Sequence, residues 1–510
     1  MFTYILIYIL STLLVYFVFS YHWKRRWLYY YAMKIPGPFN FPIIGPTHLL
    51  LGGSKELMNN LLYLTTKYPP LFKIWIQQEL YVSTTRPEDV KIILSNELDK
   101  GEFYKISKDY FKESLLIAPL HIWKDHRKII NRTFQTNVIN SFAPIFAKYA
   151  NIVCDDLKNN ISVYNTEPKD IFPILWKFTF ASACETLGDV DANLIIEKDT
   201  FLSGLFRFEE ILTERFYNPF LRSDFFWKFS VLKKETMVIS EKARDFVEQI
   251  IRINRCSKGQ QTQDVKNDAL EKRLFLNYLL ELRDTEELTH EAILQETPLM
   301  LFAASETTAI TISSVLLVLG LHHNIQENIF KEVTSILGNR DRNFTIEDVS
   351  NMDYLERVIK ETMRIFAPIP FILRTLDQDV TLDKYVLPAG TRVFFPIATL
   401  HRRADLWPDP LKFDPDRFLP GEVRKRNPFI VNQELVLVHY TYIPFSCGAR
   451  NCIGLKYAML SMKIILATIV KNYKIMETVD YKNIEDIDYY FLLVSKARKG
   501  YRLKFETRNE

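Results

Sequence analysis

Between Thr84 and about Ile365, more than half of the 510-residue chain, apolar residues recur mostly every three or four positions. This spacing places them on one face of a helix, so we predict a helical body. Two short β-type runs precede it, Leu71–Ile76 and Leu80–Ser83, and predict a hairpin. Short strands with a turn at Pro388-Ala389-Gly390 are predicted between Val380 and Pro396. We therefore expect a mainly α fold with a small β region.

The amino-terminal segment from Phe2 to Ser20 is almost wholly apolar, and ~20 such residues at about 1.5 Å each cross a bilayer as a helix. A secretory signal peptide is the alternative. However, the run is longer than a typical signal core, no basic residues precede it, and no small-residue cleavage site follows it. Lys24, Arg25 and Arg26 come next among tryptophans and tyrosines, as expected where a helix leaves a membrane on its cytoplasmic side.

This organisation predicts three parts. Residues 1–22 are expected to be a transmembrane anchor, residues 23–46 a basic and aromatic linker with a proline-rich hinge, and residues 47–510 one large domain. The most polar interruption of the large domain, Ser257 to Asp268, is interpreted as an exposed loop.

The composition limits the classes of partner. Hydrophobic residues are 48% and charged residues 25%, which permits a large core, and a dispersed formal charge of +4 does not favour a nucleic-acid partner. The five cysteines have no framework spacing, which favours a reducing compartment for the body. With only 15 glycines and no phosphate-cradling loop, a built-in dinucleotide site is not expected.

The segment Phe445–Gly454 reads FSCGARNCIG and leads into an apolar helical stretch. Gly448 and Gly454 would let the backbone turn tightly around Cys452, whose thiolate could then point at a ligand. Taken alone, Cys452 could also be a small buried hydrophobic residue, or form a redox pair with Cys447. The phenylalanine, glycine, arginine, cysteine and glycine of this segment resemble, at every spacing, the haem-binding loop of cytochromes P450.

This resemblance implies the cytochrome P450 fold and a non-covalent haem b. Cys452 would be the axial thiolate ligand of the haem iron. Arg450 would neutralise a haem propionate, Phe445 would shield the sulfur, and Gly454 would complete the haem-binding loop.

Three further residues match the family at other positions. Trp123 and Arg127 lie four residues apart on a predicted helix, and Arg374 lies ten residues beyond Arg364. By the resemblance, both arginines hold haem propionates, because guanidinium groups bind carboxylates with two parallel hydrogen bonds. Trp123 would pack beside the porphyrin.

Glu361 and Arg364 lie about one helical turn apart and so share a helix face. Alone, such a pair is commonplace on protein surfaces and contributes little. Because Arg417 follows in a Pro415-Asp416-Arg417-Phe418 segment, the three charged residues resemble the buried triad that supports the cysteine loop in this family. We expect a structural role for them.

Glu306 and Thr307 lie inside a long apolar stretch from Ile293 to Leu321. A helix-surface glutamate beside a threonine bonded to its own backbone is the simpler interpretation. By the resemblance, this stretch is the distal helix of the family, where Thr307 hydrogen-bonds the dioxygen and Glu306 relays protons.

Several stretches resemble the clan that contains fatty-acid ω-hydroxylases and many insect enzymes, and two features depart from it. Ala303 stands where many ω-hydroxylases have a glutamate esterified to the haem, so covalent haem is not expected, and Ala304 replaces the usual glycine. Roughly a dozen extra, largely apolar residues, Ile430 to Thr441, precede the cysteine loop. We hypothesise that this segment is a retained intron or a gene-model error.

The resemblance implies a monooxygenase of the endoplasmic reticulum membrane whose catalytic domain faces the cytosol. It would insert one atom of dioxygen into a small hydrophobic substrate. Its electrons would come from NADPH through NADPH-cytochrome P450 reductase, with cytochrome b5 as a second candidate donor. The alternatives are a haem-thiolate isomerase that needs no reductase, and a haem- or lipid-binding protein of this fold without turnover.

Overall fold

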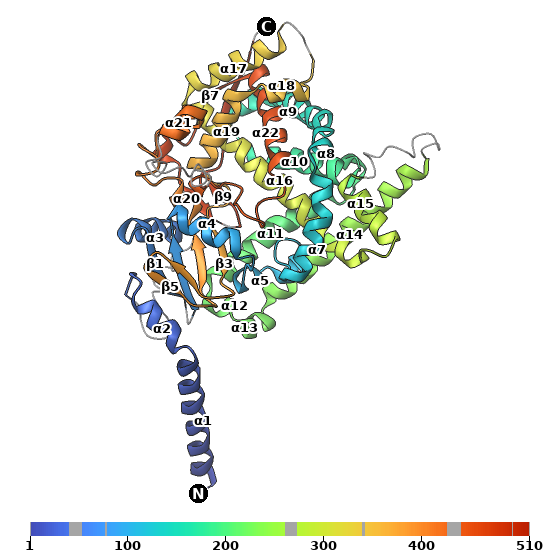
Figure 1. Ribbon diagram of the computed structural model, residues 1–510. Helices are drawn as coiled ribbons and strands as arrows, with labels where there is room; N and C mark the ends of the chain where they lie inside the picture. The colour runs from blue at the N-terminus through green and yellow to red at the C-terminus, as the bar shows by residue number, and fades with distance from the viewer. Residues whose placement is uncertain are drawn as a thin grey trace.

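The computed structural model describes residues 2–39, 54–76, 79–260, 273–338, 342–425, 440–491 and 493–508. Most of them are helical, as the apolar periodicity predicts (Figure 1). The helices are α1 (Phe2–Lys24), α2 (Arg26–Met33), α3 (Ser54–Lys67), α4 (Pro87–Asn96), α5 (Glu102–Lys105), α6 (Lys108–Phe111), α7 (Leu120–Asn131), α8 (Thr136–Asn140), α9 (Ala143–Thr166), α10 (Phe172–Gly188), α11 (Lys198–Tyr217), α12 (Pro219–Arg222), α13 (Asp224–Phe229), α14 (Val231–Gln260), α15 (Phe275–Asp284), α16 (His290–Leu321), α17 (His323–Leu337), α18 (Ile346–Ser350), α19 (Asp353–Ile365), α20 (Ile397–Leu400), α21 (Pro420–Lys425) and α22 (Leu455–Asn472). The strands are β1 (Leu71–Ile76), β2 (Glu79–Thr84), β3 (Ile372–Thr375), β4 (Val380–Leu382), β5 (Tyr385–Leu387), β6 (Arg392–Phe395), β7 (Tyr473–Thr478), β8 (Tyr489–Phe491), β9 (Ser495–Ala497) and β10 (Leu503–Thr507).

The main sheet has four strands in the order β1-β2-β6-β3. Strands β1 and β2 pair antiparallel with Leu71 opposite Thr84, which confirms the predicted hairpin. Strand β6 pairs parallel with β2 and antiparallel with β3. Most of the helices therefore lie, in the sequence, between the two halves of this sheet. Strands β4, β5 and β6 confirm the short strands predicted between Val380 and Pro396. The other sheets are the pairs β4–β5, β7–β10 and β8–β9.

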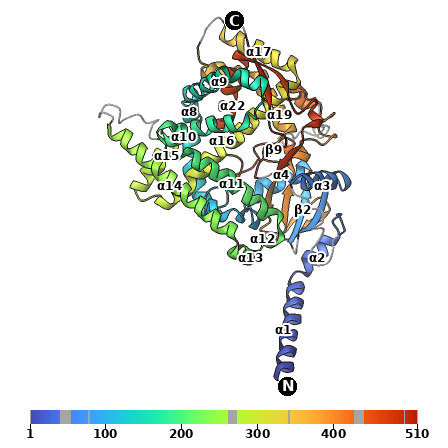
Figure 2. The same cartoon turned by 180° about the vertical axis from the view of Figure 1, so that it is seen from behind.

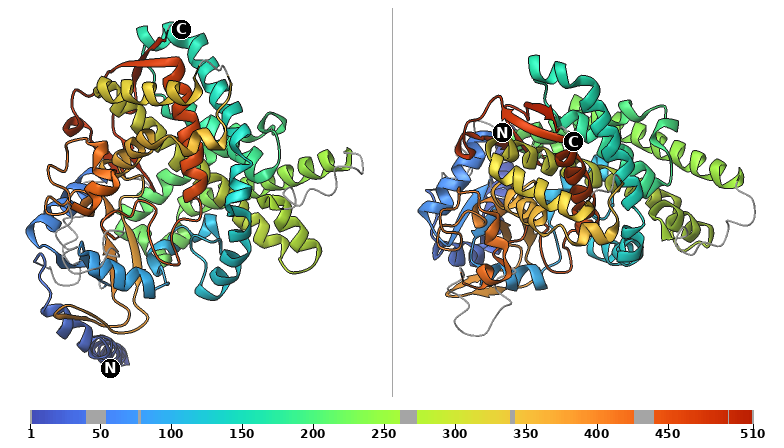
Figure 3. Two further views of the ribbon diagram at one scale, coloured as in Figure 1. Left: turned by 45° about the horizontal axis from the view of Figure 1, so that its top comes forward. Right: turned by 90° about the horizontal axis from the view of Figure 1, so that it is seen from above.

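Helix α16 runs through the core of the helical region. It packs against α10, α14, α19 and α22, and Figures 2 and 3 show it surrounded by other helices. Its residues are apolar on all sides rather than on one face, because neighbours cover it almost completely. It is long and apolar enough to cross a membrane, but its burial inside the body makes it a core helix. The helix continues through Pro298.

Helix α1 projects from one end of the body, and its side chains are exposed (Figure 1). The following helix α2 packs on the β region, where Ala32 and Ile35 are 2% exposed. Lys73 of β1 donates from Nζ to the Ala32 carbonyl at 2.6 Å. Part of the segment predicted to be a linker therefore contacts the body, whereas residues 40–46 of the predicted hinge lie outside the described residues.

Two loop predictions have different outcomes. The polar stretch from Ser257 was expected to be a loop, but α14 continues to Gln260. That prediction is wrong for Ser257–Gln260, because a helix with one packed face tolerates polar residues on its other side; residues 261–268 lie outside the described residues. The hypothesis on Ile430 to Thr441 falls mostly on residues 430–439, which also lie outside them, while Thr441 is buried.

Candidate functional site

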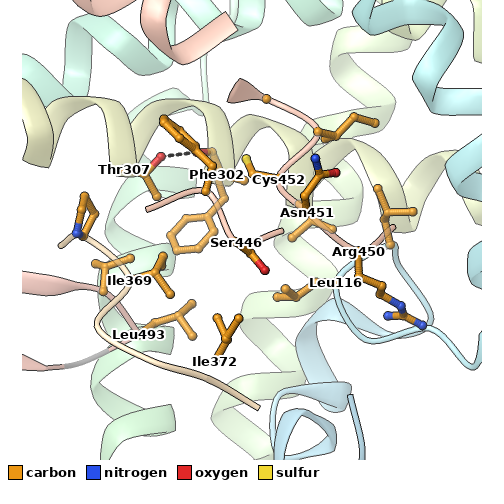
Figure 4. A pocket seen from close by; sticks show the side chains of 18 of the residues that line it. Leu116, Phe302, Thr307, Ile369, Ile372, Ser446, Arg450, Asn451, Cys452 and Leu493 are labelled. Carbon is orange, nitrogen blue, oxygen red and sulfur yellow. Dashed lines mark hydrogen bonds between the residues drawn. The ribbon is translucent and has the colours of Figure 1, made fainter. Parts of the chain in front are cut away.

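A large internal cavity lies between α16, the cysteine-containing loop and the β region (Figure 4). Its walls come from the segment between α5 and α7, from α11 and α16, from the stretch that leads into β3, and from the β8–β9 hairpin. The lining residues are predominantly apolar and include Ile106, Leu115, Leu116, Leu212, Phe216, Phe302, Ala303, Ala304, Thr307, Ile369, Phe371, Ile372, Phe491, Leu493 and Val494. Cys452, Phe445, Arg450 and Gly454 line the same cavity.

The loop before α22 turns Cys452 toward this cavity. The Cys452 amide donates to the Phe445 carbonyl at 2.8 Å, which closes the loop. Gly448 has φ +74°, and a Cβ there would lie 1.9 Å from the Leu94 carbonyl oxygen, so only glycine fits. Gly448 therefore performs the turning role that the sequence predicted.

Gly454 differs from that prediction. Its φ is −85°, which any residue adopts, and it is the N-cap of α22. A Cβ on it would lie 3.8 Å from the Cys452 sulfur, which is ordinary contact. Gly454 is therefore not required for the turn; the close approach of helix α4 places that requirement on Gly448 instead.

Four cationic side chains line the same cavity: Lys100, Arg127, Arg374 and Arg450. Among the described lining residues there is no carboxylate to balance them. The guanidinium of Arg450 lies 4.4 Å from the centre of the Trp123 ring. Burial and the neighbouring charge of Arg374 lower the pKa of Arg450 to about 10. Burial and the three neighbouring arginines also hold the pKa of Lys100 well below its ordinary value.

Several N–H groups of these arginines have no hydrogen-bond partner within the described part of the chain. They are Nε of Arg374 and both Nε and Nη1 of Arg450. Buried donors are costly when unpaired, so this arrangement suits an anionic group with two or more carboxylate oxygens. Arg127 is already engaged, because it donates to the carbonyl and side-chain oxygens of Asn451 at 2.9 and 2.8 Å. It thereby also positions the residue before Cys452.

The thiol of Cys452 faces the cavity but lies inside the protein, and this burial raises its pKa. The Gly454 amide, Arg127 and Lys100 act in the opposite direction and favour the thiolate. A thiolate facing a cavity rimmed by cations is a suitable ligand for a metal-containing cofactor that also carries carboxylates.

Thr307 and Ala303 of α16 also line the cavity, and Figure 4 shows Thr307 on this helix with Cys452 on the neighbouring loop. The Thr307 hydroxyl donates to the Ala303 carbonyl at 2.9 Å, as the simpler interpretation of the sequence has it. Glu306 does not line the cavity among the residues described. It is fully buried, with Oε1 2.5 Å from Nζ of Lys496. Glu306 and Thr307 were expected to act side by side, but they face different surroundings: Thr307 lines the cavity, whereas Glu306 contacts Lys496.

Glu361, Arg364 and Arg417 meet in the core behind the cysteine loop. Glu361 and Arg364 are 0% exposed and Arg417 is 4% exposed. Arg364 donates from Nε and Nη2 to the two oxygens of Glu361 at 2.7 and 2.9 Å, and Nε of Arg417 lies 3.3 Å from Glu361. The structure thus brings the three predicted charges together.

Sequence reasoning did not select three charged residues of this region: Lys100, Glu209 and Lys496. Lys100 is a single lysine between helices, and Lys496 lies in a Lys496-Ala497-Arg498-Lys499 run that reads as an exposed basic stretch. No periodicity marks either one as buried, so only the packing of distant segments reveals them.

The family model described as Cytochrome P450 matches residues 35–505 of the chain. Cytochrome P450 4g1 of Drosophila melanogaster is 31% identical, over 96% of this chain and 91% of that protein. Cytochrome P450 4c21 of Blattella germanica is 31% identical, over 93% and 94%. Cytochrome P450 4V2 of Homo sapiens is 28% identical, over 92% and 89%. These similarities extend over almost the whole chain.

Proposed function

This chain belongs to the cytochrome P450 family, and on that premise we propose that it is a membrane-anchored monooxygenase that inserts one atom of dioxygen into a small hydrophobic substrate. Members of this family bind haem through a cysteine thiolate. Bound haem b would supply the redox centre at which dioxygen is activated. The observation that carries the proposal is the position of Cys452, which faces an apolar cavity rimmed by four cations and no carboxylate among the described lining residues.

The residues present fit a haem. Cys452 would supply its thiolate ligand, with Phe445 beside the sulfur. Arg374 and Arg450 would bind the propionates with the donors that have no partner within the described chain. Lys100 would add a third positive charge, and Trp123 would pack against the porphyrin edge.

The chain's own groups would then control substrate and protons. The apolar walls bind a hydrophobic molecule and exclude water. The hydroxyl of Thr307, a residue of the cavity wall, holds a proton there. We propose Thr307 as the group that contacts the reacting oxygen, and Glu306 as a proton donor that acts from behind the wall.

The substrate class follows from the aromatic end of the cavity. Phe103, Phe216, Phe371 and Phe491 come from four different segments, with ring centres 4.6–6.5 Å apart between neighbours. Such a wall favours an apolar molecule, for which a lipid, a terpenoid, a hormone or a foreign hydrophobic compound is suitable.

Membrane attachment is supported by two features on one side of the molecule. Helix α1 is a candidate membrane span. The exposed side chains of Phe220, Phe225, Phe226 and Phe229 lie on α12 and α13, and Figures 1 and 2 show both helices at the end of the body from which α1 projects. We propose the endoplasmic reticulum as the membrane, with the catalytic domain in the cytosol.

Electrons are proposed to come from NADPH through NADPH-cytochrome P450 reductase, docked on the Cys452 side, with cytochrome b5 as a second donor. Lys456 of α22 is exposed on that side and donates to the Thr136 hydroxyl at 2.6 Å. It could join a basic docking rim.

The carbon monoxide difference spectrum of the reduced, membrane-expressed protein tests the thiolate-haem assignment, with Cys452→Ala as the control. We expect a long-wavelength Soret band that the control lacks. No haem in the wild type would overturn the proposal.

A second assay tests turnover. The holoenzyme, reconstituted with reductase, should consume NADPH and give an oxygenated product from a panel of hydrophobic substrates. Haem without any product would instead favour the binding protein, and product from a peroxide without reductase would favour the isomerase.

A further inference from the structure

A buried cluster of three charged residues lies directly behind the cavity wall. Lys496 is 4% exposed, and Glu209 and Glu306 are 0% exposed. Nζ of Lys496 lies 2.8 Å from Oε2 of Glu209 and 2.5 Å from Oε1 of Glu306. One ammonium group thus joins two carboxyl groups away from solvent.

Aromatic rings complete the surroundings of this ammonium group. Nζ of Lys496 lies 4.9 Å from the ring centre of Phe172, 5.4 Å from that of Trp176 and 5.3 Å from that of Phe206. Rings at these distances attract a cation electrostatically. The lysine is therefore held from several sides.

Burial and mutual contact shift the pKa values of Glu306 and Lys496. Burial raises the pKa of Glu306 well above its ordinary value, and the charge of Glu209 raises it further. Burial lowers the pKa of Lys496, but the two carboxyl groups outweigh this effect and raise it above its ordinary range. The raised pKa of Glu306 favours its neutral form, which reduces the charge that the interior must hold around Lys496.

Each member of the cluster belongs to a different wall of the cavity. Glu209 lies on α11, about one turn before Leu212 and Thr213, which line the cavity. Glu306 lies on α16 beside Thr307. Lys496 lies on β9, and the hairpin that it ends carries the lining residues 491, 493 and 494.

We propose that Lys496 is a positioning residue: by binding Glu209 and Glu306 together, it holds three walls of the cavity at a fixed spacing and so limits the width of the ligand that the cavity admits. This inference rests on the proposed function, because it takes the cavity as the binding site for ligand beside the haem. The hairpin has a separate tie to α16 through Tyr489 and Ser314, whose hydroxyl oxygens are 2.9 Å apart. The fold can therefore persist when the cluster is altered.

The double variant Glu209→Gln, Lys496→Met tests the proposal. Methionine keeps the length and apolar stem of the lysine, and glutamine avoids leaving an unpaired buried charge. Imidazole and two N-substituted imidazoles, one carrying a single phenyl ring and one carrying three aryl rings, are titrated into the ferric holoenzyme. Their binding is followed by the shift of the Soret band.

Without the contacts of Lys496 to Glu209 and Glu306, the walls are free to move apart, so the affinity for the widest imidazole should rise relative to that for the smallest. Because buried, charged contacts of this kind are lost, we expect the ratio of the Kd values of these two imidazoles to change on the order of tenfold. A merely structural role would lower the amount of haem-loaded protein, which changes the amplitude of the shift and leaves this ratio unaltered. An unchanged ratio in the loaded variant overturns the proposal.

The matched control is Glu477→Gln, Lys504→Met, which removes a lysine–glutamate pair of 2.5 Å on the exposed β7–β10 sheet, where the two side chains are 58% and 36% exposed. It should leave the ratio unchanged. If the double variant fails to load haem, Glu209→Gln alone releases only the α11 wall and should shift the ratio in the same direction. Failure of the proposed function is recognised separately, because the wild type would then show no thiolate-haem spectrum or no turnover.

Discussion

Replacing Glu361 by alanine should destabilise the protein far more than removing an equally well-formed ion pair from its surface. Glu361 accepts two hydrogen bonds from Arg364 and one from the Asp414 amide at 3.0 Å, and it lies beside Arg417. Glu361→Ala leaves two guanidinium groups in the interior without their counter-ion. Breaking a buried pair in this way costs about 3–5 kcal/mol, out of a total stability of roughly 5–15 kcal/mol.

The surface pair of Arg207 and Glu235 is the control. Arg207 donates from Nε and Nη2 to the two oxygens of Glu235 at 2.7 and 3.0 Å, a two-point contact like that of Arg364 with Glu361. Its side chains are 41% and 37% exposed. Because water solvates the arginine that remains, Glu235→Ala should cost about 0.2–1 kcal/mol.

Urea unfolding of the holoprotein, followed by far-ultraviolet circular dichroism, measures both costs, and the haem content of each variant is measured in parallel. Glu361→Ala should lose most of its haem, whereas Glu235→Ala should retain it. Equal shifts of the two unfolding midpoints would refute the reasoning from burial. Full haem retention by Glu361→Ala would refute the supporting role of the triad. Burial raises the pKa of Glu361 despite its arginine neighbours, so the triad is costly to break without being a large net source of stability.

Three further outcomes are expected. Burial lowers the pKa of His401 from 6.5 to about 3. Between these two pH values the unfolded chain binds a proton that the folded chain does not. The free energy of unfolding therefore falls as the pH falls, by about 1.4 kcal/mol per pH unit. Between about pH 6 and pH 4, the urea midpoint of His401→Gln should fall less steeply with pH than that of the wild type. Parallel pH dependences of the two midpoints would contradict this. Gly448→Ala should abolish haem loading, whereas Gly338→Ala should not. Both glycines have positive φ, but a Cβ at Gly338 meets nothing within 4 Å. Similar haem loading of the two variants would exclude the clash of a Cβ at Gly448 with helix α4. Thr307→Val should form less product per NADPH consumed and Thr307→Ser should restore it, so equal coupling in both variants would remove the hydroxyl from the mechanism.

The fold class, the hairpin and the short strands could be predicted from the sequence because they depend on local periodicity and on turn residues. The same holds for the environment of Cys452. The spacing of Phe445, Gly448 and Arg450 within one loop determines which groups can surround the sulfur. The charges of Glu361 and Arg364 could be paired from sequence, since one helical turn separates them.

The surroundings of Glu306 required the tertiary structure. Thr307 is its immediate neighbour, yet one faces the cavity and the other faces Lys496, because successive residues of a helix point about 100° apart and the packing of α10, α11 and β9 decides which direction is core. Gly454 illustrates the same limit, since its backbone is ordinary and the glycine requirement falls on Gly448, where helix α4 approaches. Local spacing thus determined the chemistry that this chain carries, whereas contacts between segments far apart in the sequence decided which of its charged groups line the cavity and which hold its walls together.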